Sequence, residues 1–455
     1  MADTAHTARA ADPAGPVNLV GPAHTADIPD VGAGPAGLQD VRGTNLGLVL
    51  RAVRALAPCS RAAVAAATGL NKTTVSSLVA DLISRGLLRE TGESAERRVG
   101  RPGVMLALDH RTIAAIGLEV NVDYLSVVAV DLLERDLVTR HLPFDARAAG
   151  PDACARRIAE AVRAVAGDPA LRDRAVIGVS VGVPGLVDSP TGTITRAPNL
   201  GWSHTPLRAR LLELLASPGA VPGAPAAPPP VLVDNDANLG AVAEYRSGHR
   251  ARTRDLVYIT GEVGIGAGVL VDGELLRGSS GFAGEIGHTR MVEDGPACGC
   301  GRRGCLEALA GIEAILRSAL PDRFPGGALT RADLAGLVAA AVERAGAGDP
   351  VAVAALRAAG TWLGRGAALL VNLLNPGAVV LGGYFVPLAP WLLPECRAAV
   401  RELAFAPDAA GCVVEPSVLG LSAAARGGAM AMVDALEGGR LPLPPPRAAV
   451  PAGGG

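Results

Sequence analysis

The sequence predicts an α/β protein of two or three domains, in which a small helical module precedes a larger body of alternating strands and helices. The chain has 455 residues, more than one domain usually holds, and 49% of them are hydrophobic, which excludes a wholly disordered chain. After Thr112, short apolar runs typical of buried strands alternate with amphipathic helical segments for more than 300 residues. Before Thr112 the apolar periodicity is that of helices.

Both ends of the chain and one internal stretch have compositions typical of flexible segments. Residues 1–40 are rich in Ala, Pro, Gly, Asp and Thr without periodicity, so we expect a disordered arm. Residues 437–455 are expected to form a similar flexible tail. Residues 217–230, which read SPGAVPGAPAAPPP, are expected to form an exposed flexible loop inside a domain.

The first module, residues 41–110, has the order of elements of a winged helix-turn-helix. Apolar residues spaced i, i+3, i+4 and i+7 predict helices with one buried face. Ser60 and Asn71 are expected to cap the second and third helices, and Gly86 to end the third. The expected helices and strands lie at residues 45–56, 61–67, 72–85, 87–88 and 104–108.

The outer face of the third helix predicts contact with DNA. It carries short hydroxyl side chains and the one lysine of the chain, groups that bond base edges or phosphates in a major groove. A basic turn follows between the two strands and suits a minor groove or a phosphate backbone. The alternative is a protein-binding helical module with a solvated polar face. The predicted DNA-binding residues are Lys72, Thr73, Thr74, Ser76, Ser77, Arg97, Arg98 and Arg101.

The charge distribution agrees with a DNA partner for this module. Residues 41–111 contain 11 basic and 5 acidic residues, a net charge of +6, and since the whole chain has −2, the rest carries −8. A basic module on an acidic body suits one domain that meets phosphates and one that does not.

A cysteine cluster predicts a structural zinc site. Three of the seven cysteines lie within eight residues and follow a histidine in the pattern H-x9-C-x-C-x4-C. Thiolates and an imidazole are the usual tetrahedral ligands of zinc, and four protein ligands leave no position for a reactive water. The alternative is a set of reduced cysteines without metal. The predicted ligands are His288, Cys298, Cys300 and Cys305.

No segment of the sequence predicts a membrane span or a secretion signal. Unbroken apolar runs stay below the roughly 18 residues that a span needs. The N-terminus lacks a basic segment followed by an apolar one. We therefore expect a cytoplasmic protein with no membrane partner.

Around the cysteine cluster the sequence resembles the ROK family, named for repressors, open reading frames and kinases. Residues 284–288 (GEIGH) and 298–307 (CGCGRRGCLE) are similar to the family signature, and the resemblance covers about residues 112–434. The first module resembles the helix-turn-helix of the repressor branch, which includes xylose and N-acetylglucosamine repressors. The resemblance implies an actin-like, sugar-kinase-like body with two lobes, at 111–235 plus 421–436 and at 236–420, and sugar bound between them.

The resemblance also implies a set of sugar-binding residues. Residues 198–202 (PNLGW) resemble the sugar-proximal loop, and 234–238 (DNDAN) resemble the catalytic segment, in which the aspartate at Asp236 takes the proton of a sugar hydroxyl. Carboxylates suit vicinal hydroxyls through charge-assisted hydrogen bonds. Turn capping or solvation is the alternative for each residue taken singly. The implied residues are Asn199, Asn235, Asp236, Glu285, His288, which would also bind zinc, and Glu307.

The phosphate loops of family kinases are altered here. The kinase segment Asp-x-Gly-Gly-Thr corresponds to residues 119–123 (EVNVD), which places Asp123 where phosphate oxygens should lie. The kinase segment Gly-Thr-Gly-Ile-Gly corresponds to residues 262–266 (EVGIG). Two like charges about 4 Å apart repel by roughly 4 kcal/mol at an effective dielectric constant of about 20. Residues 381–383 (LGG) resemble the nucleotide-side loop. We expect no useful ATP binding, so Asp236 would be a vestigial base.

These patterns predict a sugar-responsive DNA-binding regulator, a repressor, whose body binds a sugar effector without phosphorylating it. A homodimer or homotetramer would bind double-stranded operator DNA, and the direction of the sugar effect stays open. One alternative is an ATP-dependent sugar kinase fused to a DNA-binding module. Another is a body that binds a protein partner and no sugar.

Overall fold

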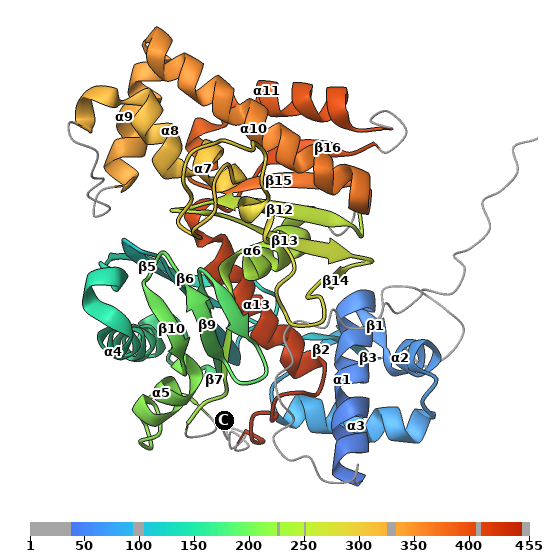
Figure 1. The fold of residues 1–455 in the computed structure, drawn as a ribbon. Coiled ribbons are helices and arrows are strands. Elements are labelled where there is room, and N and C mark those ends of the chain that lie inside the picture. The colour runs from blue at the N-terminus through green and yellow to red at the C-terminus, as the bar shows by residue number, and fades with distance from the viewer. Residues whose placement is uncertain are drawn as a thin grey trace, which may run out of the picture.

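The computed structural model describes residues 38–93, 104–224, 228–249, 252–324, 334–405 and 411–447, and shows a small N-terminal domain packed against a larger α/β body (Figure 1). Within these ranges we find no helix whose length and apolar character would let it cross a bilayer.

The N-terminal domain has the three helices and two strands that the sequence predicts, with one further short strand. Ser60 caps the second helix, since its hydroxyl accepts the Ala63 N–H at 3.2 Å, and Asn71 caps the third by accepting the Thr74 N–H at 2.8 Å. The strands form one sheet in the order β1-β3-β2. The elements are α1 (Leu38–Leu56), β1 (Cys59–Ser60), α2 (Arg61–Thr68), α3 (Lys72–Ser84), β2 (Leu88–Glu93) and β3 (Val104–Leu108).

Two details of this domain differ from the prediction. Helix α1 begins at Leu38 rather than at residue 45, so the last residues of the expected arm are helical. The turn between β2 and β3, which carries Arg97, Arg98 and Arg101, lies outside the described residues.

The body contains two five-stranded sheets with the same connectivity. In each, a central strand pairs antiparallel with the next strand and parallel with a later one; the orders are β6-β5-β4-β7-β11 and β14-β13-β12-β15-β16. We call the parts built on them the first and second lobes. The strands of the first sheet are β4 (Ile113–Val120), β5 (Tyr124–Val130), β6 (Asp136–Pro143), β7 (Ala175–Val183) and β11 (Val231–Asn235). Those of the second are β12 (Leu256–Gly261), β13 (Ile265–Val271), β14 (Glu274–Leu275), β15 (Ala378–Gly383) and β16 (Val413–Pro416).

Two helices, α6 (Asp236–Glu244) and α13 (Ala423–Glu437), pack against each other between the sheets. Helix α13 lies on β4 and β7, and α6 lies on β12 and β13. A Cβ added to Gly427 of α13 would overlap the Leu239 carbonyl oxygen of α6. Small residues therefore permit this close contact, which joins the lobes.

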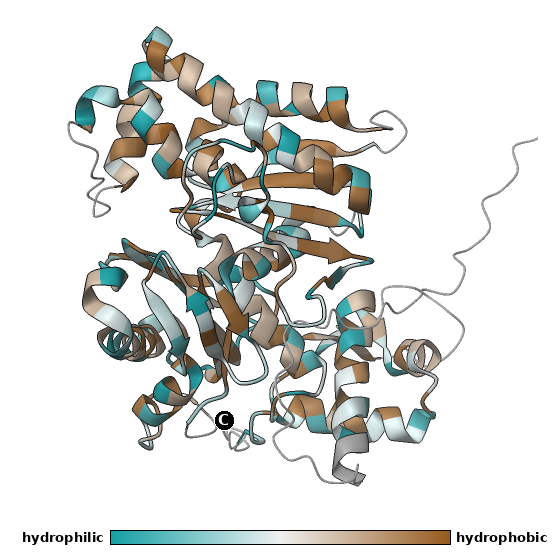
Figure 2. Cartoon of the chain, viewed as in Figure 1, coloured by the Kyte–Doolittle hydropathy of each residue, from teal (hydrophilic) through white to brown (hydrophobic). Residues whose placement is uncertain are grey.

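The remaining elements cover the outer faces of the sheets, whose strands are largely hydrophobic (Figure 2). The first lobe carries α4 (Ala146–Ala166), α5 (Leu207–Leu214) and a small sheet of β8 (Leu186–Asp188), β9 (Thr193–Ala197) and β10 (Trp202–Thr205). The second carries α7 (Leu306–Ala310), α8 (Ile312–Ala319), α9 (Leu334–Gly346), α10 (Pro350–Leu374) and α11 (Phe385–Leu403). Short turns of other helix types are η1 (Pro169–Leu171), η2 (Tyr245–His249), η3 (Ile286–His288), η4 (Pro321–Arg323) and η6 (Gly420–Ser422).

The expected flexible loop at 217–230 is attached to the first lobe where it is described. Val221 is only 4% exposed, and the Gly223 carbonyl accepts the Val176 N–H at 3.0 Å. The low-complexity composition predicted an exposed loop. In the structure, the Val221 side chain is buried, and the backbone of the loop bonds to strand β7. Residues 225–227 lie outside the described part.

The expected flexible tail is wrong for residues 438–447, which cross to the N-terminal domain. Leu441 is 5% exposed in the core of that domain. The Arg447 N–H donates to the Ser84 carbonyl at 2.8 Å, and the Arg85 guanidinium donates to the Pro444 carbonyl at 2.8 Å. The tail therefore packs against the N-terminal domain through the buried Leu441 side chain, and its backbone bonds to the residues at the end of α3. Residues 448–455 are not described.

Candidate functional site

A cavity of 730 Å³ lies between the lobes and is lined by residues of both. Its volume is within the range of about 300–1,000 Å³ typical of small-molecule sites. The structure brings all six predicted sugar-binding residues to this one cavity, although they are spread over more than a hundred positions of the chain. They are Asn199, Asn235, Asp236, Glu285, His288 and Glu307.

The end of β11 and the start of α6 form one wall of the cavity. Asn235 is the N-cap of α6: its Oδ1 accepts the Asn238 N–H at 3.0 Å, and its amide donates to the Gly185 carbonyl at 3.1 Å. The bonds of the Asn235 side chain are therefore those of a helix cap, which was the alternative to sugar binding for this residue. Asp236 is 7% exposed, and burial raises its pKa to about 6, with the negative charge of Glu285 adding to the effect.

The opposite wall comes from η3 and α7 of the second lobe. Glu307 accepts the Ile265 N–H at 3.2 Å, and a side chain at Gly264 would overlap its carboxylate. His288 Nε2 lies 4.0 Å from a Glu285 oxygen. These contacts hold two carboxylates and an imidazole on the cavity wall, as recognition of hydroxyl groups requires.

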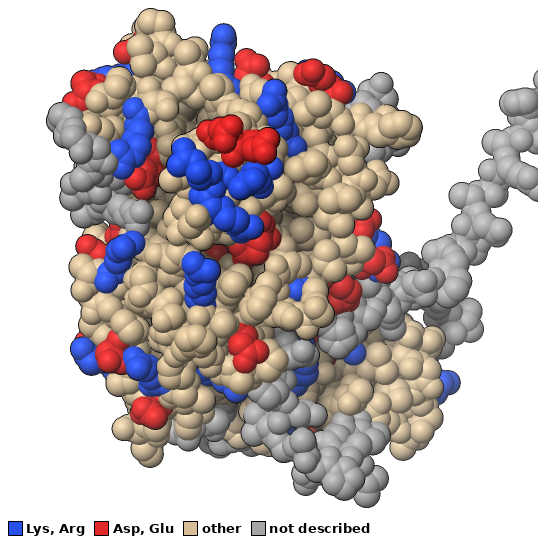
Figure 3. All heavy atoms as spheres, viewed as in Figure 1, with Lys and Arg blue, Asp and Glu red and all other residues tan. Residues whose placement is uncertain are grey.

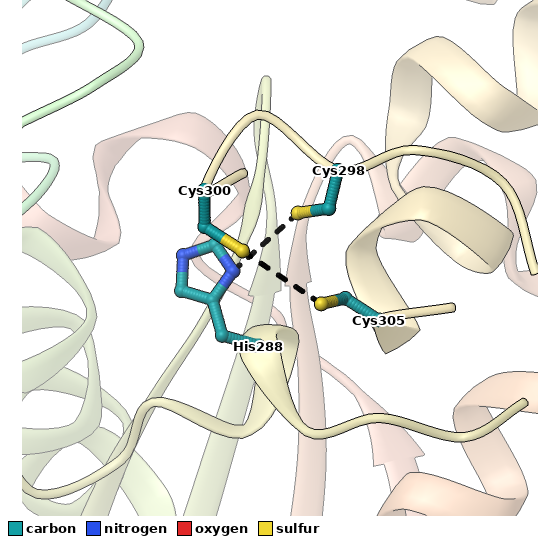
Figure 4. A group of neighbouring side chains, drawn as sticks. All are labelled: His288, Cys298, Cys300 and Cys305. Atoms are coloured by element: carbon teal, nitrogen blue, oxygen red, sulfur yellow. Dashed lines mark hydrogen bonds between the residues drawn. The ribbon is translucent and has the colours of Figure 1, made fainter. Parts of the chain in front are cut away.

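The other ring nitrogen of His288 faces the cysteine cluster (Figure 4). His288 Nδ1 lies 3.7 Å from Cys298 Sγ, Cys300 Sγ lies 3.8 Å from Cys305 Sγ, and the four ligand atoms are all within 4.8 Å of one another. Tetrahedral bonds of about 2.3 Å to a metal place two sulfurs roughly 3.8 Å apart. The four side chains therefore fit a tetrahedral metal ion, and the shared histidine links that position to the cavity.

The segments that resemble the kinase phosphate loops contribute two buried carboxylates, one on the cavity wall and one beside it. Glu119 of the first lobe and Glu262 of the second are 3% and 7% exposed. Asn121 donates its amide to Glu262 at 2.9 Å, and the Tyr124 hydroxyl lies 3.0 Å from Glu119 and 3.4 Å from Glu262. These bonds connect the two lobes.

A second link between the lobes lies next to this cluster. The Tyr384 hydroxyl donates to Asp123 at 3.2 Å. A Cβ added to Gly383, in the segment that resembles the nucleotide-side loop, would overlap a Glu262 oxygen. The Glu262 carboxylate therefore lies directly on the backbone of that loop.

The two buried glutamates hold a proton more firmly than exposed carboxyls do. Burial raises the pKa of Glu119 to about 8, and the charge of Asp236 adds to this. Burial also raises the pKa of Glu262 well above its usual range, and Glu119 contributes. At neutral pH the pair is therefore not fully ionised.

The predicted DNA-contacting face of α3 is free of the domain core. Lys72, Thr73, Ser76 and Ser77 are exposed and Thr74 is half-buried, whereas the apolar side of the helix is buried. The Ser76 hydroxyl donates to the Lys72 carbonyl at 2.9 Å. Four of the five predicted side chains therefore lie at the surface.

Sequence reasoning missed three arginines that line the cavity: Arg196, Arg290 and Arg302. Arg196 lies on β9, three residues before Asn199 of the predicted sugar-proximal loop, but the motif that predicts Asn199 assigns this arginine no role. Arg290 and Arg302 lie close to the metal ligands, and the motif that predicts those ligands assigns the arginines no role.

Comparisons with known proteins agree with this architecture. Residues 115–435 match the ROK family, and residues 46–92 match the IclR helix-turn-helix domain. The xylose repressor of Bacillus subtilis strain 168 is 30% identical over 397 residues, which are 87% of this chain and 96% of that protein.

Two solved structures confirm the expected fold class. A ROK family transcriptional regulator, a homologue of the E. coli MLC protein, matches with a TM-score of 0.70 at 26% identity and covers 88% of this chain and 97% of its own. A ROK family glucokinase from Streptomyces griseus, in complex with glucose and AMPPNP, matches with a TM-score of 0.57 at 31% identity over 70% of this chain and 98% of its own.

The raised pKa of Glu119 predicts that the protein loses stability as the pH rises. The folded state holds this proton more tightly than the unfolded chain, so the contribution is present below about pH 4.5 and is lost by about pH 8. Thermal unfolding between pH 6 and pH 8.5 should show a falling midpoint, and Glu119→Gln should flatten that slope. The exposed helix variant Glu160→Gln is the control. An unchanged slope in Glu119→Gln would contradict the assignment.

Proposed function

The chain belongs to the ROK family, and we propose that it is a sugar-responsive transcriptional repressor that binds its sugar without phosphorylating it. One observation carries the proposal: the six predicted sugar-binding residues line one cavity, while the segments that resemble phosphate loops contribute two buried carboxylates, Glu262 on the same cavity and Glu119 beside it. Such a site suits a sugar, and its buried carboxylates oppose the phosphates of a nucleotide.

The N-terminal domain supports the DNA-binding part of the proposal. Its helix-turn-helix match and the polar face of α3 suit a major groove, and the Bacillus subtilis relative is named a xylose repressor. We propose that a homodimer or homotetramer places two α3 helices on an inverted repeat. Binding to chromosomal DNA would place the protein in the cytoplasm.

The alternative function is an ATP-dependent sugar kinase, which the similarity to a glucokinase favours. Phosphoryl transfer needs backbone N–H groups and cations around the phosphates. Here the Asn121 amide is bonded to Glu262, and the Glu262 carboxylate covers Gly383. Even in its neutral form this side chain stays in contact with the Gly383 backbone, so we favour a regulator.

Helix α6 and the residues after it connect the cavity to the N-terminal domain. Its first turn carries Asp236, and η2 after its last turn carries Arg246. Arg246 donates to Asp434 of α13 at 3.0 Å and, through Nε, to Glu134 at 3.2 Å. The helix thus extends from the cavity to an ion cluster at the far side of the first lobe.

Arg54 of α1 completes this ion cluster from the N-terminal domain. It donates to Glu437 of α13 at 2.6 Å and lies 3.7 Å from Glu134. The Arg246 and Glu437 side chains are only 8% and 3% exposed, so these pairs are weakly screened by solvent. We propose that sugar binding moves α6, and that the cluster passes this movement to α1 and so to α3.

We propose that the metal held by His288 and the three cysteines is zinc. Four protein ligands leave no site for water, so the ion would be structural. It would fix the His288 ring so that Nε2 faces the cavity.

The function is tested by three measurements on the purified full chain. Selection from randomised duplexes should yield an inverted repeat, calorimetry should detect a sugar, and ADP release should stay at background with that sugar. Sugar-dependent turnover above about 1 per second would support the kinase. Glu285→Ala should abolish the heat of sugar binding in calorimetry. If this variant still gives that heat, the sugar binds elsewhere.

The Lys72→Ala variant gives a matched test of the DNA face. Removing one cation from α3 should weaken binding to the selected duplex and reduce the salt slope by about 1. Sugar binding in the same variant should match the unaltered protein. If the affinity and the slope for DNA do not change, α3 does not contact the phosphates.

If the ion cluster carries the movement, a variant without it should still bind sugar and DNA, but sugar should no longer change the affinity for DNA. Arg54→Met combined with Glu437→Gln removes the link without leaving one buried charge unpaired. Sugar and DNA should each bind separately, but sugar should no longer change DNA affinity in fluorescence anisotropy. Arg61→Ala, which breaks the Arg61–Glu90 pair inside the N-terminal domain, is the control. Retained coupling in the double variant would exclude this route.

The zinc assignment predicts about one zinc per chain in elemental analysis of purified protein. Cys300→Ser should lower the zinc content and, because His288 is then free to turn, weaken sugar binding. Cys412→Ser, outside the cluster, should change neither. A metal-free protein with full sugar affinity would show that the four side chains need no ion.

A further inference from the structure

The arginines that line the cavity come from both lobes. Arg196 lies on β9 of the first lobe, and Arg290 and Arg302 lie between η3 and α7 of the second. Figure 3 shows basic side chains gathered over the middle of the molecule, in front of the segment between η3 and α7. Three basic side chains therefore line the cavity, together with the exposed carboxylate of Glu285.

These guanidinium groups have no acidic partner in the part of the chain that the structure describes. No ion pair joins any of the three to a carboxylate there. By contrast, Arg277 is paired with Asp234 of β11 at 2.7 Å. The side chains of all three cavity arginines are exposed. Arg196 and Arg290 are thus available to a ligand, whereas the Arg302 guanidinium bonds to the Cys300 sulfur.

The deep end of the cavity has the opposite character. Asp236 and Glu262 are buried there, next to Glu119. An anionic group of a ligand would meet these carboxylates if it pointed inward, and would meet guanidinium groups if it pointed outward. The charge distribution therefore sets the orientation of a charged sugar, with its hydroxyls inward and its anion at the opening.

We propose that the cavity binds a sugar that carries an anionic substituent, a phosphate or a carboxylate, held between Arg196 of the first lobe and Arg290 of the second. The planar guanidinium groups donate two parallel hydrogen bonds to either kind of anion. The inference rests on the proposed sugar-binding function and adds the chemical class of the ligand.

An anion held from both sides also gives a physical reason for lobe closure. A ligand shifts a conformational equilibrium only by its difference in affinity between the two states. An anion that contacts Arg196 and Arg290 together binds better when the lobes approach. A neutral sugar lacks this contribution.

Calorimetry with the full chain tests the inference, using glucose and N-acetylglucosamine as neutral probes. The anionic probes are glucose 1-phosphate, glucose 6-phosphate, N-acetylglucosamine 6-phosphate and glucuronate, which separate phosphate from carboxylate and one end of the sugar from the other. At least one anionic form should bind about tenfold or more tightly than its neutral parent at low salt. That advantage should fall as the salt concentration rises.

Arg196→Gln and Arg290→Gln should each lower the affinity for the anionic form more than for its neutral parent. Arg303→Gln is the matched control, because Arg303 lies on the same loop and does not line the cavity. Neutral sugars that bind as tightly as every anionic form would overturn this inference and leave the proposed function standing. A chain that binds none of these probes but binds xylose would overturn this inference alone, and a chain that binds no sugar at all would overturn both.

Discussion

The contact between α6 and α13 is the constraint on which the rest of this structure depends. Each helix covers one of the two sheets, and the small residues at their contact allow the backbones to approach closely. The start of α6 forms a wall of the cavity, and the end of α13 reaches α1 through the Glu437–Arg54 pair. In the proposed mechanism, a change of cleft geometry reaches the N-terminal domain through these two packed helices, since a close-packed contact cannot deform gradually.

Polar groups divide the cleft between the lobes into two regions with different chemistry. In one, carboxylates and an imidazole held by the cysteine cluster face open space, where hydroxyls can satisfy them. In the other, Asn121, Tyr124 and two glutamates bond to one another, and Asn121 and Glu262 face the cavity from this side. A buried polar group is costly unless it is bonded, so the second region is stable only when filled by its own side chains. The difference between these regions is the physical basis of the proposed sensor.

Much of this molecule could be predicted from its sequence, because the signals are local. The caps at Ser60 and Asn71, the strands of both lobes and the cysteine spacing depend on neighbouring residues. The pairing of Arg54 with the distant Glu437 could not be predicted, because no periodic or motif signal links the two residues. Arg196 was missed although it lies three residues before Asn199, because the motif assigns it no role. The packing of residues 438–447 on α3 was missed because a composition rich in proline resembles that of a free tail.

In the proposed mechanism, sugar binding and DNA binding share one conformational equilibrium, and neither needs a nucleotide. The most direct test is whether sugar and DNA change each other's affinity by the same factor. The affinity for the effector sugar is measured by calorimetry on the free chain and on the chain saturated with its selected duplex, without ATP. Thermodynamic linkage requires that DNA change sugar affinity by the same factor by which sugar changes DNA affinity, typically 5- to 150-fold. We predict equal factors in this range. A sugar affinity that is identical with and without DNA would contradict the account.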